Sequence, residues 1–476
     1  MKSAYSRTEL KPRILHFGLG AFFRAHLADY TDAANRLSSE KWGIRAVKTR
    51  PGGDILTNAI NANGGVYTLV ETSSAGAEAN VISSLYDTVF YCDNPAAVFA
   101  TFCEPDFAIV TTTITEKGYC FDFGKSKLDE TNGDIIYDRA HPEQPRSVPG
   151  IIVRGLSLRK LAGLGGITLL SCDNMTNNGH TFKKTICDFA RLQDGNLADW
   201  IEQEVSFPCA MVDRIVPAMT ETSFQEAELV SGYSDKAAIV CEKFKQWVVE
   251  DDFRNGRPDW DKAGAIFTTR VEPFEEMKLR LLNGSHSSLA YCGYLCGYET
   301  VDEAINNDKL HKLIVRYWNN EAIPTLEQPP GISLTEYCTK LIERYRNPAL
   351  KHRLWQIAMD GSQKLPYRLL NGLRANIAAG RDYSVTAFVL AAWLRYVSTV
   401  DDVGTVIDVR DPLAAEFRAA YDSAETAANY VRKVFEQQRV FGEDLSGNEQ
   451  LIKVVIGYYE QMKRFGTKAV LEMLLK

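Results

Sequence analysis

Residues 14–20, Ile-Leu-His-Phe-Gly-Leu-Gly, decide the fold, because they join a short β-rich run to two glycines and then to helix-compatible sequence from about residue 22 to residue 37. Glycines in such a turn let the backbone approach a pyrophosphate, and the start of the following helix supplies free amides. The third glycine of the usual fingerprint is replaced by Phe23, so the match is weak by itself. Arg24 strengthens it, because a guanidinium can pair with phosphate. The predicted cofactor contacts in this stretch are Gly18, Gly20, Phe22, Phe23 and Arg24.

Short β-rich runs alternate with helical ones through the first half of the chain, at residues 14–17, 43–48, 107–113, 166–172, 211–216 and 237–240. Alternation of this kind predicts a parallel, doubly wound sheet. From about Lys278 onward, apolar residues recur mostly at helical spacing and few persuasive strands remain. We therefore predict an α/β protein with a Rossmann-type dinucleotide-binding domain over residues 1–255. A mostly α-helical substrate and catalytic domain follows over residues 256–476.

Composition narrows the class of protein further. The length of 476 residues suits two to three domains, and the net charge of −7 favours neither nucleic acid nor an anionic membrane as a partner. No apolar run reaches membrane-spanning length, and the first residues lack the apolar core of a signal peptide. The ten cysteines are scattered, without Cys-x-x-Cys or His-Glu-x-x-His spacing, so we expect no metal site. We expect a cytoplasmic protein.

The end of the second predicted strand bears on the choice of cofactor. It carries Lys48 and Arg50 where dinucleotide-binding proteins usually place an acid. These cations either accept a 2′-phosphate, which favours NADP, or are simply solvated. Asp54 is the alternative ribose ligand, so NAD and NADP both stay open.

A threonine-rich run, residues 111–119, ends a further predicted strand and continues into Glu116. Ligands of such sheets sit at the carboxyl ends of the strands, so the hydroxyls of Thr113 and Thr115 are candidates for the nicotinamide site. A Thr-rich strand edge without a ligand is the alternative.

Lys278, Asn283 and His286 form the strongest candidate for chemistry, in the run Lys-Leu-Arg-Leu-Leu-Asn-Gly-Ser-His. In an α-helix of about 100° per residue, the three would share one side, with Lys278 and His286 about 12 Å apart along the axis. Lys278 and His286 are then too far apart to contact each other, but close enough to bind one small polar molecule between them. A surface lysine, an Asn-Gly interruption and a structural histidine are the alternative reading.

Five segments resemble the polyol-specific long-chain dehydrogenases, the mannitol dehydrogenase family, along nearly the whole chain. They are Phe17 to His26, Thr113 to Tyr119, Ser171-Cys-Asp-Asn174, Phe207 to Pro217, and the Lys-x4-Asn-x2-His spacing that starts at Lys278. The run Met-Val-Asp-Arg-Ile-Val-Pro, residues 211–217, is close to the signature of that family. The resemblance implies zinc-independent, NAD(P)-linked interconversion of a secondary alcohol and a ketone on a linear sugar derivative.

The resemblance also implies roles for single residues. Lys278 matches the catalytic lysine, which acts as the general base, and Asn283 and His286 match its hydrogen-bonding partners. The oxyanion-binding asparagine matches Asn174, although Asn178 lies close enough in sequence to stay an alternative. A lysine serves as base when burial and neighbouring cations depress its pKa.

A further match, residues 359–368, implies that Lys364 reaches the substrate. Eight residues before it, mannitol 2-dehydrogenases tend to carry an arginine, whereas this chain has Gln356, which looks more like the fructuronate reductase (D-mannonate oxidoreductase) branch. Lys364 and Arg368 could then bind a sugar-acid carboxylate, with a structural role for Arg368 as the alternative. We predict D-fructuronate and D-mannonate as substrates with NAD as cofactor. The alternatives are a polyol 2-dehydrogenase and a non-catalytic dinucleotide-binding protein; a monomer or weak homo-oligomer is expected.

Overall fold

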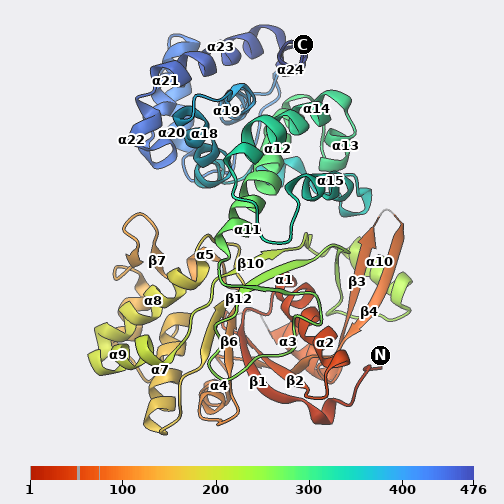
Figure 1. Ribbon diagram of the computed structural model, residues 1–476, viewed down its shortest axis with the longest axis vertical. Helices are drawn as coiled ribbons and strands as arrows, with labels where there is room; N and C mark the ends of the chain where they lie inside the picture. The colour runs from red at the N-terminus through yellow and green to blue at the C-terminus, as the bar shows by residue number, and fades with distance from the viewer. Residues whose placement is uncertain (1, 51–53, 74) are drawn as a thin grey trace. The chain divides into compact units, whose positions relative to one another are not determined.

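The computed structural model describes residues 2–50, 54–73 and 75–476. It divides into two compact units, residues 1–272 and residues 273–476 (Figure 1). The domain boundary predicted after residue 255 stays a prediction.

Unit 1 is built on a parallel five-stranded sheet with the order β5-β2-β1-β6-β9 (Figure 1). The strands are β1 (Lys11–Phe17), β2 (Trp42–Lys48), β5 (Leu85–Phe90), β6 (Ile109–Thr112) and β9 (Thr168–Ser171). Side chains alternate across β1, so that Leu15 and Phe17 pack on one face and Ile14 on the other. Helices cover both faces, which is why these strands are apolar on both sides. The predicted doubly wound sheet is confirmed.

The helices of unit 1 lie mainly between these strands. They are α1 (Ala21–Ala25), α2 (Leu27–Leu37), α3 (Asp54–Ala62), α4 (Pro95–Phe102), α5 (Thr115–Gly118), α6 (Gly133–Ala140), α7 (Val148–Leu161), α8 (Asn178–Gln193), α9 (Gly195–Glu204) and α10 (Glu221–Ser231). The single helix predicted over residues 22–37 is divided at His26, whose φ of −129° and ψ of −87° are not helical.

Smaller sheets complete unit 1. One is ordered β10 (Ala210–Asp213), β12 (Gln246–Glu250) and β13 (Ile266–Thr268); another is ordered β11 (Ile239–Glu242), β3 (Tyr67–Ser73) and β4 (Gly76–Ile82); a hairpin joins β7 (Phe121–Asp122) to β8 (Lys127–Leu128). The polar stretch at residues 250–261 contains Trp260, which is fully buried against Trp247 with ring centroids 4.7 Å apart.

The regular elements described in unit 2 are helices, as predicted. Its main helices are α11 (Glu272–Met277), α12 (Gly284–Leu295), α13 (Val301–Ile305), α14 (Asp308–Arg316), α15 (Leu334–Tyr345), α16 (Leu354–Ala358), α17 (Gly361–Leu365), α18 (Asn371–Ala378), α19 (Ser384–Val397), α20 (Ala414–Asp422), α21 (Ala427–Phe435), α22 (Gln438–Ser446), α23 (Glu449–Phe465) and α24 (Thr467–Leu474). Three π-helical segments interrupt them: η2 (Lys278–Asn283), η3 (Tyr317–Ala322) and η6 (Pro366–Leu370). No helix in the described part of the chain is long and apolar enough to cross a membrane.

Helix α19 forms the centre of the unit 2 core, with every side chain from Val385 to Val397 buried. Its first turn is capped by Glu321 of η3. The carboxylate accepts hydrogen bonds from the amides of Val385 (2.6 Å) and Thr386 (2.9 Å) and from the Thr386 hydroxyl (2.6 Å). Burial nevertheless raises the pKa of Glu321 to about 7, since desolvation outweighs these bonds.

We predict that Glu321 makes the stability of the protein pH-dependent. Because its folded pKa lies above its unfolded one, its stabilising contribution is fully present below the unfolded pKa of about 4.3 and is lost as the pH rises through about 7. Glu321→Gln cannot titrate. The free energy of unfolding of the wild type, relative to that of the variant, should fall by on the order of 2 kcal/mol between about pH 5 and about pH 8. A difference that does not change with pH, measured by urea unfolding, would contradict this.

Candidate active site

The glycine turn after β1 is held tightly to the neighbouring strand. Gly18 has a φ of +112°, and a Cβ atom there would lie 2.2 Å from the carbonyl oxygen of Thr113. The Thr113 hydroxyl donates to the Gly18 carbonyl (2.9 Å), and its amide donates to Phe17 (2.9 Å). By contrast, a Cβ added at Gly20 would meet no atom within 4 Å. Gly18 is therefore required by the fold, whereas Gly20 leaves open space of the kind a pyrophosphate needs.

The aromatic and basic residues after this turn face the protein interior. Phe23 is fully buried and stacks on His16 with ring centroids 3.7 Å apart, while Phe22 stacks on His26 at 4.9 Å. Arg24 is buried and donates to the carbonyls of Gly20 and Ala237. In this conformation its guanidinium ties α1 to the segment before β11.

The loop after β6 is organised by Asp173, which follows the end of β9. Its carboxylate accepts from the amides of Ile114 (3.1 Å) and Thr115 (2.7 Å) and from the Tyr119 hydroxyl (2.7 Å). These bonds hold Thr115 at a φ of +62°, a conformation that non-glycine residues rarely adopt. The side chains of Thr115 and of Glu116 beside it are exposed at the carboxyl end of β6.

The two asparagines that follow β9, Asn174 and Asn178, differ in burial. Asn178 is fully buried and its amide is used by the backbone: Nδ2 donates to Ala210 (2.7 Å) and Asp173 (3.1 Å), and Oδ1 accepts from the Ala210 amide (2.9 Å). Asn174 is exposed in the loop that leaves β9. Geometry therefore favours Asn174 over Asn178 as a ligand to substrate.

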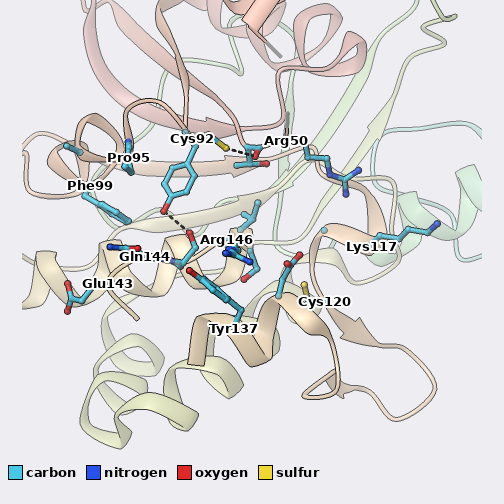
Figure 2. A pocket seen from close by; sticks show the side chains of 18 residues that line it. Arg50, Cys92, Pro95, Phe99, Lys117, Cys120, Tyr137, Glu143, Gln144 and Arg146 are labelled. Carbon is cyan, nitrogen blue, oxygen red and sulfur yellow. Dashed lines mark hydrogen bonds between the residues drawn. The ribbon is translucent and has the colours of Figure 1, made fainter. Parts of the chain in front are cut away.

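A cavity of about 760 Å³ opens beside the carboxyl ends of β2 and β5 (Figure 2). Its lining includes Arg50, Phe99, Lys117 and Arg146, and the Arg146 guanidinium lies 3.3 Å above the ring of Tyr137. Among the residues that the structure describes, none forms an ion pair with Arg50, Lys117 or Arg146. The lining also includes the carboxylates of Asp134 and Glu143. An aromatic surface with cations at the carboxyl ends of parallel strands suits a nucleotide.

The other residues predicted at the end of β2 are placed differently. Lys48 is the last residue of the strand and is absent from the lining of the cavity. The side chain of Asp54, at the start of α3, lies outside the described residues, as do residues 51–53. The prediction for Asp54 as a ribose ligand therefore stays a prediction.

In unit 2, Lys278 and Asn283 are the first and last residues of the π-helical segment η2, and His286 follows in the first turn of α12. The wider π turn replaces the uniform α-helix on which the 100° estimate rests. Three aromatic side chains donate to carbonyls of this segment: Tyr317 to Arg280 (3.0 Å), Trp318 to Leu281 (2.9 Å) and Tyr345 to Leu282 (3.0 Å). Lys278, Asn283 and His286 are each 6–7% exposed.

Two of these three side chains carry buried polar atoms without a hydrogen-bond partner. The atoms are Nδ2 of Asn283 and Nε2 of His286, and Nδ1 of His352 shares this property. Orphaned buried polar atoms are rare in proteins, and a group of them points to a binding site for a ligand or water. Burial, followed by the charges of His352, Arg368 and Arg344, lowers the pKa of His286 well below its usual value, so the imidazole is neutral at physiological pH.

The two predicted substrate cations differ in their partners. Lys364 donates to the Met359 carbonyl (2.6 Å) and lies 3.9 Å from the Asp360 carboxylate. Arg368 donates to the Ser287 hydroxyl (3.2 Å) but has no carboxylate within ion-pairing distance among the described residues. Burial lowers its pKa. Arg368 is thus a largely covered guanidinium with no counter-ion of its own.

Family models agree with this two-unit arrangement. The mannitol dehydrogenase Rossmann domain matches residues 12–262, and the mannitol dehydrogenase C-terminal domain matches residues 270–463. The chain belongs to the mannitol dehydrogenase family. The family predicted from the sequence is confirmed, and the protein is a dehydrogenase of that family.

Relatives cover nearly the whole chain. The D-mannonate oxidoreductase of Escherichia coli (strain K12) is 42% identical over 98% of this chain and 96% of its own. The uncharacterized oxidoreductase YeiQ of the same organism is 43% identical over 99% and 96%. The solved mannitol 2-dehydrogenase of Pseudomonas fluorescens, a ternary complex with NAD and D-mannitol, is 34% identical over 99% and 96%, with a TM-score of 0.89.

Within each unit, the predicted residues only partly come together. In unit 1, Gly18, Gly20 and Thr113 meet at one turn, and Arg50 lines the neighbouring cavity. In unit 2, His286 lies close enough to Arg368 that the charge of Arg368 lowers the pKa of His286. Sequence reasoning missed Asp173 and His352; a polar residue directly after a predicted strand was the available signal for Asp173, and none marked His352. In the described part of the chain, no three His, Cys, Asp or Glu side chains are grouped to hold a metal ion.

We predict that alanine at Gly18 lowers the stability of the protein, whereas alanine at Gly20 weakens cofactor binding. Gly18→Ala places a Cβ against the Thr113 carbonyl at a positive φ, so it should destabilise unit 1 by more than about 1 kcal/mol. Gly20→Ala should change stability by less than about 0.5 kcal/mol, yet weaken NADH binding at least about tenfold by filling the space for the pyrophosphate. Thermal unfolding and NADH fluorescence titration measure the two effects. Unaltered NADH binding by Gly20→Ala would contradict the assignment of this turn.

Proposed function

We propose that this dehydrogenase transfers a hydride reversibly between NAD and a sugar acid, D-mannonate, whose oxidised partner is D-fructuronate. The observation that carries the proposal is the uncompensated guanidinium of Arg368 beside the orphaned polar atoms of His286 and His352. A buried cation without a counter-ion is costly, and a substrate carboxylate would supply one. The 42% identity to a D-mannonate oxidoreductase supports the same substrate.

In the proposed mechanism, Lys278 takes the proton from the substrate hydroxyl as a hydride leaves the carbon. The side chain is 7% exposed, and no metal is needed if a nearby base accepts this proton. The unpartnered Nδ2 of Asn283 donates to the developing alkoxide, and Asn174 is proposed as a second donor. His286, which is neutral, orients a substrate hydroxyl through Nε2.

The residues of unit 1 fit NAD. The open space at Gly20 suits the pyrophosphate, and the aromatic, cationic cavity that contains Phe99 and Arg50 suits the adenosine end. When bound, NAD supplies the hydride acceptor for oxidation. Arg50 follows the end of β2, where a cation can accept a 2′-phosphate, so use of NADP belongs in the test.

A substrate panel tests the proposed function. The wild-type enzyme should oxidise D-mannonate with a kcat/KM roughly 100-fold above that for D-mannitol, D-sorbitol or D-arabinitol, because only the acid pairs with Arg368. Each substrate is assayed with NAD and with NADP. A polyol 2-dehydrogenase, which the likeness to mannitol 2-dehydrogenase favours, would show equal or better activity on a polyol. That outcome would overturn the sugar-acid assignment.

Replacement of Lys278 tests the base. Lys278→Ala should lower kcat by roughly 10²–10⁴-fold at neutral pH, with part of the loss recovered at higher pH as hydroxide replaces the amine. Lys309→Ala, which removes an exposed lysine of α14, is the matched control and should leave kcat unchanged. Turnover by Lys278→Ala equal to that of wild type at every pH would rule out the lysine base.

A further inference from the structure

His352 is a second imidazole in the unit 2 site. It lies between α15 and α16, where its carbonyl accepts a hydrogen bond from the Val301 amide (3.0 Å) and so fixes the backbone. Its ring stands perpendicular to that of His286, with centroids 5.4 Å apart. On its other side, His286 packs on Tyr345 at 4.7 Å. The ring of His352 therefore borders the same space as His286.

The Nδ1 atom of His352 is shielded from solvent and has no hydrogen-bond partner. The nearby Nε2 of His286 is in the same condition. Leaving one buried polar atom unpaired costs about 1–3 kcal/mol, so two of them on adjacent rings indicate a shared ligand with polar groups. Among the described residues, no carboxylate is hydrogen-bonded to His286 or His352, so a structural ion pair does not account for the position of either ring.

Two cations, Arg368 and Lys364, influence the pKa of His352. Burial, followed by the charges of Arg368 and Lys364, lowers its pKa to about 4, and no carboxylate counteracts this. The ring is therefore neutral at physiological pH and carries one N–H donor. If Arg368 pairs with one oxygen of an anion, a neutral N–H donor beside it can donate to another oxygen of the same anion. This second contact adds no further buried charge.

We infer that His352 is a specificity-determining residue whose Nδ1–H donates to the carboxylate of the substrate, next to the guanidinium of Arg368. This inference rests on the proposed sugar-acid function and extends it, since it names a residue that recognises the acid group rather than the reacting carbon. Arg368 neutralises the carboxylate charge, and the hydrogen bond from His352 orients the carboxylate. His286, on the other side of the perpendicular pair, stays available for a hydroxyl.

Two substitutions at His352 separate hydrogen bonding from packing. His352→Leu fills similar space but removes the donor, whereas His352→Asn keeps an amide N–H near the position of Nδ1. The matched control is His311→Leu in α14, which removes a histidine whose pKa is lowered by burial and then by Arg346, with Asp308 opposing, rather than by the site cations. Steady-state kinetics with NAD are measured for D-mannonate and D-mannitol, together with calorimetric binding of D-mannonate.

His352→Leu should lower kcat/KM for D-mannonate by about 10–100-fold, chiefly through KM, and weaken D-mannonate binding by a similar factor. Its kcat/KM for D-mannitol should change by less than about threefold, because mannitol has no carboxylate. His352→Asn should recover part of the loss, and His311→Leu should match wild type for both substrates.

Equal losses on the two substrates would show that His352 only supports the fold, and no loss on D-mannonate would show that it does not contact the acid; either result overturns the inference. The proposed function is judged separately, from the wild-type ratio. If wild type prefers D-mannonate and His352→Leu keeps that preference, only the inference fails. If wild type shows no preference, the proposed function fails and the inference with it.

Discussion

The π turn over Lys278–Asn283 is the constraint on which the rest of the candidate site depends. Such a turn departs from the regular α-helical ladder, and three of its carbonyls, those of Arg280, Leu281 and Leu282, accept hydrogen bonds from aromatic side chains of η3 and α15. These side-chain donors tie the π turn to η3 and α15. The core of unit 2 thereby holds Lys278, Asn283 and His286 almost wholly buried.

Close packing extends this constraint to the proposed acid-binding residues. A Cβ atom at Gly284, directly after the π turn, would lie 2.4 Å from the Tyr317 hydroxyl and 2.9 Å from the carbonyl of Arg368. The turn and the segment η6 therefore approach as closely as backbone allows. That approach brings the Arg368 guanidinium to Ser287 and close to the two imidazoles. Burial lowers the pKa of Arg368, and Tyr291 and Tyr345 partly oppose this effect. A cation placed there without a carboxylate is better explained by recognition of an anion than by stability.

Much of the fold could be predicted from local patterns. The strand, glycine pair and helix at residues 14–37 predicted the parallel sheet because each element is short and bounded by clear signals. The division of the helix at His26 could not be predicted from local pattern, since it accompanies tertiary packing of that ring, which stacks on Phe22 and packs at a tilt on Tyr30. Lys278, Asn283 and His286 could be selected as candidates because they are close in sequence. His352 was not, because a chain turn outside any regular pattern brings it to His286.

The most direct test of this account is the ratio of kcat/KM for D-mannonate to that for D-mannitol in wild type and in Arg368→Met. Removal of the guanidinium should lower the ratio by roughly 100-fold through loss of activity on the acid, while activity on mannitol stays within about threefold of wild type. Because Arg368 lacks a counter-ion, the variant should also unfold at a temperature no lower than wild type. An unchanged ratio, or an equal fall on both substrates, would contradict the claim that Arg368 binds the substrate carboxylate.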